Sequence, residues 1–153
     1  MQLFEEMRYT RRVSVWPVAF AGGLMVEKPK VEWNEHKQIY SVIGWDEGRF
    51  VEPRPFCIDM AGFAVNLQFF LDRPKAQFPY GYTQLKFLKE GYSIDQESAF
   101  LSMLGIELKD LEPKADGCTK VYVWHTKTKK PNLIFENDRQ NMHLPPSNTG
   151  IIV

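Results

Sequence analysis

Short blocks of apolar residues separated by polar ones predict a chain of short elements. Residues 3–9 carry apolar side chains at helical spacing, and two glutamates lie in the first turn, where the helix dipole favours negative charge. They predict a short helix. Residues 13–20 are β-branched and aromatic and predict a strand. Because proline has no N–H for a sheet ladder, Pro17 places this strand at an edge or at a bulge.

The middle of the chain has a weaker pattern. Residues 28–48 are polar and predict a hairpin or surface loop with one strand at 39–43. Residues 57–67 predict a second, buried strand region. A helix is expected over residues 66–71, and it ends at Pro74 because proline cannot continue a helix.

The clearest helix pattern covers residues 95–104. Ser93 or Asp95 can cap it, apolar residues form one face, and Gly105 ends it. After it, residues 111–113 predict a turn and residues 120–124 a strand.

Everything after residue 130 is expected to be an extended tail. Strands and helices interleave without a regular βαβ rhythm, so the fold class expected is α/β with a mixed sheet and flanking helices.

Composition limits the possible functions. The chain has 153 residues, enough for one domain with its own core. Basic and acidic residues balance at 19 each, which excludes a global field for nucleic acid. No apolar run is long enough to cross a membrane, and no signal-peptide pattern is present. Cys57 and Cys118 are expected to be free, at least half-buried thiols.

Three sets of charged residues could carry chemistry. Glu97 lies in the first turn of the helix over residues 95–104, where it could stabilise the helix dipole or act as a base. Arg54 and Asp59 flank an apolar run, so they predict a buried ion pair or a polar sugar site. A solvated basic patch or an anion contact is expected from Lys127, Lys129 and Lys130.

Longer motifs carry a resemblance to a known family. They read Leu-Phe-Glu-Glu-Met-Arg at residues 3–8, Arg-Pro-Phe-Cys-Ile-Asp-Met-Ala-Gly-Phe-Ala-Val at 54–65, and Val-Tyr-Val-Trp-His-Thr at 121–126. Together they resemble the C-terminal half of the animal β-1,3-glucuronosyltransferases that build the glycosaminoglycan linkage region. The resemblance covers nearly all of residues 3–131.

The resemblance implies that residues 1–131 form the acceptor-binding half of a GT-A-type, nucleotide-diphospho-sugar transferase fold. In the family, a nucleotide-binding half with an Asp-rich metal motif comes before the segment matching residues 3–8. The ligands of a manganese ion are therefore expected there and none in this chain. Residues 132–153 correspond to a tail that crosses to a partner in a homodimer. The matching position here is Phe135, which cannot make the family's hydrogen bond.

The activity implied is inverting transfer of glucuronic acid from UDP-glucuronate to the 3-hydroxyl of a terminal galactose. The family's enzymes are type II membrane proteins of the Golgi, with a lumenal catalytic domain. This chain alone is expected to be inactive. The alternatives are a non-catalytic galactose-binding half-domain and a diverged transferase of another sugar.

The resemblance also implies roles for single residues. Glu97, in Glu-Ser-Ala-Phe-Leu, matches the catalytic base, and one carboxylate suffices for a single inverting displacement. Glu27, Arg54 and Asp59 match residues that bind the acceptor galactose. Phe50 stands near the family's Trp that stacks on the sugar, and a Phe ring offers a smaller platform.

The donor side is implied by Val-Trp-His-Thr-Lys-Thr-Lys-Lys-Pro at residues 123–131. His125 matches a histidine that contacts the nucleotide diphosphate. Lys127 stands where the family has an arginine, so the cation is kept but the planar fork is lost. Both substitutions, Lys127 and Phe50, favour the diverged-transferase alternative.

Overall fold

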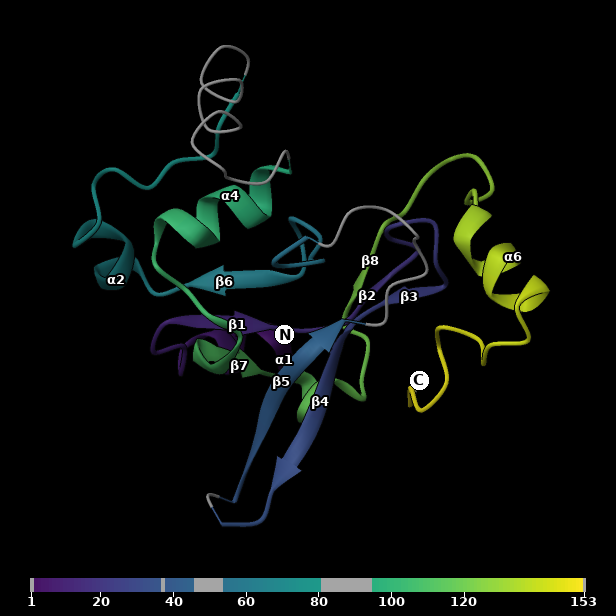
Figure 1. Ribbon diagram of the computed structural model, residues 1–153, viewed down its shortest axis with the longest axis horizontal. Coiled ribbons are helices and arrows are strands. Elements are labelled where there is room, and N and C mark those ends of the chain that lie inside the picture. The colour runs from purple at the N-terminus through teal and green to yellow at the C-terminus, as the bar shows by residue number, and fades with distance from the viewer. Residues whose placement is uncertain (1, 37, 46–53, 81–94, 153) are drawn as a thin grey trace.

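The computed structural model describes residues 2–36, 38–45, 54–80 and 95–152 (Figure 1). Within them the strands form sheets ordered β6-β1-β7 and β3-β2-β8 and a hairpin of β4 and β5. The mixed α/β class is confirmed. The elements are α1 Gln2–Met7, β1 Val13–Val15, β2 Val18–Ala19, β3 Val26–Glu27, β4 Pro29–Asn34, β5 Ile39–Trp45, β6 Phe63–Val65, α2 Leu67–Leu71, α4 Gln96–Met103, η1 Leu108–Asp110, β7 Leu111–Pro113, α5 Ala115–Cys118, β8 Val123–Trp124 and α6 Ile134–Asn141.

The segment predicted as one strand over residues 13–20 is two strands that meet at Pro17. β1 lies between antiparallel β6 and parallel β7, while β2 lies between antiparallel β3 and parallel β8. The expectation of an edge strand is therefore wrong. Pro17 falls between β1 and β2, so its missing N–H interrupts neither ladder.

The main core forms around β1 and α4. Val13 and Val15 are fully buried, and Phe100, Leu101 and Leu104 of the α4 region pack in the same cluster. This confirms the apolar face predicted for residues 95–104.

Predicted helix starts are confirmed by their caps. Asp95 is the N-cap of α4, and its carboxylate accepts from the Ser98 backbone N–H at 2.7 Å. Asn66 caps α2 in the same way, accepting from the Phe69 N–H at 3.1 Å. The helix expected at the chain start is also present as α1.

Several strand predictions need correction. Residues 111–113, predicted as a turn, are strand β7, because pairing with the buried β1 outweighs the turn preference of Glu-Pro. Only Phe63–Val65 of the region at 57–67 and only Val123–Trp124 of that at 120–124 are strand. The hairpin and its strand at 39–43 are confirmed, as β4 and β5.

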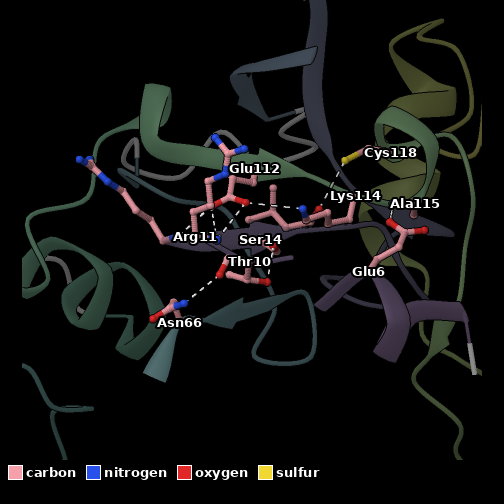
Figure 2. A network of polar contacts seen from close by, with 11 residues as sticks. Glu6, Thr10, Arg11, Ser14, Asn66, Glu112, Lys114, Ala115 and Cys118 are labelled. Carbon is pink, nitrogen blue, oxygen red and sulfur yellow. Dashed lines mark hydrogen bonds and ion pairs between the residues drawn. The ribbon is translucent and has the colours of Figure 1, made fainter. Parts of the chain in front are cut away.

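Polar contacts fasten the ends of β1 and β7 (Figure 2). The Glu112 carboxylate accepts from the backbone N–H groups of Arg11 and Arg12 at 2.9 and 2.7 Å and lies 3.5 Å from Lys114 Nζ. Glu6 of α1 accepts from the Ala115 N–H at 2.6 Å. The Glu112 contacts tie β7 to the residues before β1, and the Glu6 contact ties α1 to α5 beyond the other end of this strand pair.

Both cysteines are buried thiols that form no disulfide, as predicted. Burial raises the pKa of the Cys118 thiol to about 12, so it stays protonated. In the described part of the chain, no helix is both long and apolar enough to cross a membrane.

The segment after residue 130 is not an extended tail. It contains α6 and folds back on its own chain beside β2 and β3 (Figure 1). The backbone N–H groups of Phe135 and Glu136 donate to the Gly23 carbonyl at 3.1 Å, and Ile152 bridges to Lys120. Exchange of this segment in a dimer stays a prediction.

Candidate active site

Glu97 lies in the first turn of α4 and is half-buried. Burial raises the pKa of its carboxyl, and the negative charges of Asp95 and Asp59 raise it further. A hydrogen bond from its own backbone N–H and the Arg54 cation oppose this shift. Three predicted site residues, Glu97, Asp59 and Arg54, therefore lie in one electrostatic neighbourhood.

Ser98 holds the start of α4 against the segment that carries Arg54 and Asp59. Its hydroxyl donates to the Phe56 carbonyl at 2.7 Å and accepts from the Phe56 N–H at 3.3 Å. Ser98 is fully buried. The sequence pattern predicted no role for Ser98, although this residue directly follows Glu97 in the matching motif.

A tight turn presents Asp59. The Gly62 N–H donates to the Asp59 carbonyl at 2.7 Å, and the Ala61 N–H donates to Asp59 Oδ1 at 2.8 Å. A Cβ on Gly62 would lie 3.0 Å from the Asp59 carbonyl oxygen and 3.2 Å from Val18. The small residues of this motif therefore let the turn pack closely on β2.

Asp59 contacts the predicted donor-side histidine. His125 Nε2 lies 2.9 Å from Asp59 Oδ1. His125 directly follows β8, and its backbone N–H donates to the Ala19 carbonyl at 2.9 Å. Among the described residues, Asp59 contacts His125 and forms no ion pair with Arg54, so that part of the buried-pair interpretation is wrong.

Glu27 is positioned by the same sheet that positions His125. It lies on β3 opposite Val18 of β2, and Val18 pairs on its other side with Val123 of β8. Gly22 has a φ of +57°, and a Cβ there would lie 2.6 Å from Glu27 Oε2. The turn between β2 and β3 thus needs glycine both for its conformation and for space beside this carboxylate.

The remaining predicted residues are less constrained. Lys127 is exposed two residues after His125, and Lys129 and Lys130 are exposed as well. Exposure suits both a solvated patch and an anion contact. Phe50 lies outside the described residues. The described part of the chain contains no group of three or more His, Cys, Asp or Glu side chains arranged to hold a metal ion.

Residues 1–129 match the sequence profile of glycosyltransferase family 43. This chain belongs to that family. The match includes every predicted site residue, and the resemblance seen in the sequence motifs is thereby confirmed.

Named relatives are close in sequence. The chain is 52% identical over 139 residues to galactosylgalactosylxylosylprotein 3-beta-glucuronosyltransferase 1 of Homo sapiens and of Rattus norvegicus. It is 48% identical over 136 residues to galactosylgalactosylxylosylprotein 3-beta-glucuronosyltransferase 2 of Homo sapiens. These matches cover 91% and 89% of this chain.

The chain spans 37% of the length of these relatives. A match of 139 residues cannot fit within the first 131, so the similarity reaches into the C-terminal segment. The expectation that the resemblance stops at residue 131 is therefore wrong.

Proposed function

We propose that this chain is the acceptor-binding half of a GT-A-type enzyme that transfers glucuronic acid from UDP-glucuronate to the 3-hydroxyl of a terminal galactose. The relatives are named as 3-beta-glucuronosyltransferases. The observation that carries the proposal is the half-buried Glu97, whose pKa is raised, beside Asp59 and Arg54. This is an arrangement suited to a general base facing a sugar.

In the proposed reaction, Arg54 and Asp59 bind the galactose and hold its 3-hydroxyl near Glu97. The Glu97 carboxylate takes the hydroxyl proton as the oxygen forms its bond to the anomeric carbon of glucuronic acid. The bond from that carbon to UDP breaks on the opposite face, so the configuration inverts and UDP leaves. A raised pKa makes Glu97 a stronger base than an exposed glutamate.

On the donor side, His125 and Lys127 would contact the diphosphate, and Glu27 and Phe50 would complete the acceptor site. A manganese ion is also expected in such enzymes, but the described residues offer no ligand cluster for it. Its ligands are proposed to lie outside this chain. A Golgi location, a type II membrane anchor and a homodimer belong to the same proposal for the whole protein.

Two other functions remain as alternatives. A galactose-binding half-domain without chemistry would use Arg54 and Asp59 in the same way. Transfer of another sugar is favoured by Lys127, where the family has arginine.

The test is a chimaera in which this chain replaces the matching stretch of the human 3-beta-glucuronosyltransferase 1. With manganese and a digalactoside, it should transfer from UDP-glucuronate and not from UDP-galactose or UDP-glucose. The 153-residue chain alone should show no transfer. A chimaera that folds and binds the digalactoside without turnover would favour the half-domain. Preference for another nucleotide sugar would favour the diverged transferase.

A further inference from the structure

The bond between Asp59 and His125 joins the two sides of the proposed site. We propose that Asp59 is a positioning residue for His125 and thereby couples diphosphate binding to acceptor binding. This rests on the proposed function for the ligands, but the pair itself is a property of the chain. One carboxylate would serve both substrates.

The two oxygens of Asp59 have different surroundings. Oδ1 accepts from the Ala61 N–H at 2.8 Å and lies 2.9 Å from His125 Nε2. No hydrogen bond to Oδ2 is present among the described residues. The side chain is 17% exposed and His125 is 36% exposed, so both can still be reached from outside. Oδ2 is therefore available for a sugar hydroxyl while Oδ1 holds the histidine.

The contact fixes where the histidine carries its proton. An ionised carboxylate can only accept hydrogen bonds, so His125 Nε2 must carry the hydrogen that lies between them. Nδ1 is then bare in the neutral ring. To donate from Nδ1 to a diphosphate oxygen, the ring must become an imidazolium with a proton on each nitrogen. With Nε2 held by the Asp59 carboxylate, Nδ1 is the nitrogen left for a contact with the diphosphate.

Charges of both signs lie around the pair. Lys127, two residues further along the chain, adds positive charge on the donor side. Asp95, Asp59 and Arg54 all act on the Glu97 carboxyl, so Asp59 also lies near a negative and a positive charge of the acceptor side. A hydroxyl donated to Oδ2 would hold the carboxylate in the rotamer that holds His125. Coupling of this kind is reciprocal, so each substrate should tighten binding of the other.

Both partners are held by rigid neighbours. The buried Trp16 donates its indole N–H to the Ala61 carbonyl at 2.9 Å, and its backbone N–H donates to the Gly62 carbonyl at 3.0 Å. The turn of residues 59–62 is thereby fixed to the β1–β2 segment. His125 is fixed to β2 through Ala19. The Asp59 and His125 side chains are therefore in contact without any reordering of the chain, as a preorganised site requires.

A contact that only stabilises the fold between β8 and this turn would have the same geometry. The test must therefore separate a stabilising role of Asp59 from a positioning role. The first measurement is nitrogen-15 NMR of the 153-residue chain. In the wild type, the His125 ring should be the Nε2–H tautomer, with an Hε2 signal protected from water. Asp59→Ala should abolish that protection, and Asp72→Ala, which removes an exposed aspartate, should not. A wild-type ring in the neutral Nδ1–H tautomer, or protection unchanged in Asp59→Ala, would overturn the positioning role. Should Asp59→Ala fail to fold, Asp59→Leu, which also lacks an acceptor, is measured under the same criteria.

The second measurement uses the chimaera and calorimetric titration of UDP with and without a digalactoside. The digalactoside should tighten UDP binding by about fivefold or more. Asp59→Asn and His125→Gln should each remove that factor, and the double variant should remove no more than either alone. An equal factor in wild type and Asp59→Asn would refute the coupling. If the NMR result holds but the chimaera binds neither UDP nor digalactoside, the proposed function fails while the positioning of His125 stands.

Discussion

Two glutamates lie in the first turns of two helices, but the pKa values of their carboxyl groups are shifted in opposite directions. Glu97 lies in the first turn of α4 and Glu136 in the first turn of α6. Burial raises the pKa of the Glu97 carboxyl. Burial acts in the same direction on Glu136, but hydrogen bonds from Ser147 and Met25 and the nearby Arg139 cation lower its pKa overall.

The difference lies in how many donors surround each carboxylate. Glu136 is only 2% exposed and accepts from the Met25 N–H at 3.0 Å, from the Ser147 N–H at 2.9 Å and from the Ser147 hydroxyl. For Glu97, the hydrogen bond that lowers its pKa comes from its own backbone N–H. Because these donors surround it, the buried Glu136 carboxylate holds the C-terminal segment in place. Burial with few donors leaves Glu97 free to accept a proton.

The comparison is tested most strongly by Glu97→Gln in the chimaera. Glutamine keeps the size of the side chain but cannot take the hydroxyl proton, so turnover should fall about 10²–10⁴-fold. The Michaelis constant for UDP-glucuronate should change little. Stability should be maintained or rise, because a half-buried charge is removed. The matched control is Glu35→Gln at an exposed glutamate. Turnover near that of the wild type would mean that Glu97 stabilises the helix and does not act as the base.

Glu136→Ala should act on stability instead of chemistry. It leaves the buried N–H groups of Met25 and Ser147 without their carboxylate, which should lower the free energy of unfolding by about 3 kcal/mol. Urea unfolding of the 153-residue chain measures this. Hydrogen exchange should show faster opening at residues 23–26 and 134–152, with the α4 amides less affected. Loss of protection confined to α4 would contradict the role of Glu136 in holding the C-terminal segment.

The sequence predicted Glu97 and missed Glu136 for a physical reason. The α4 region has its own cap at Asp95 and an apolar face, so local pattern is enough to place it. Helix α6 has no side-chain cap, and its contacts are with Gly23 and Met25 more than a hundred residues earlier. Such pairings cannot be deduced from local spacing.

The site shows the same division between local and distant information. Motifs singled out Glu97, Asp59 and His125 individually, and the fold brings Asp59 close to both of the others. The contact between Asp59 and His125 could not be predicted, because it depends on how β8 pairs with β2. The buried Ser98 was missed because its partner, Phe56, is 42 residues away.

Lys127 should have a smaller effect than either glutamate because its side chain is exposed. If it contacts the diphosphate as a point charge, Lys127→Ala should weaken UDP binding to the chimaera by about 1–3 kcal/mol. The loss should shrink as salt rises. Lys127→Arg should preserve or tighten binding, since a guanidinium can grip two oxygens. Lys129→Ala is the control from the same exposed segment. Equal affinities in all variants would make Lys127 part of a solvated basic face.

The smallest expected effect is on the pH dependence of stability, and its sign separates the two glutamates. The lowered pKa of Glu136 gives stability that is present above the pKa of an unfolded glutamate and is lost as the pH falls through the folded value. The raised pKa of Glu97 acts oppositely, because stability falls as the pH rises through the folded value and the half-buried carboxyl ionises. Urea unfolding of the 153-residue chain between about pH 3 and 8 should therefore show that Glu136→Gln has a lower free energy of unfolding than wild type near neutral pH. This difference should shrink as the pH falls. Glu97→Gln should gain stability relative to wild type toward neutral pH. Parallel curves for the two variants would mean that their surroundings do not differ as the donor counts indicate.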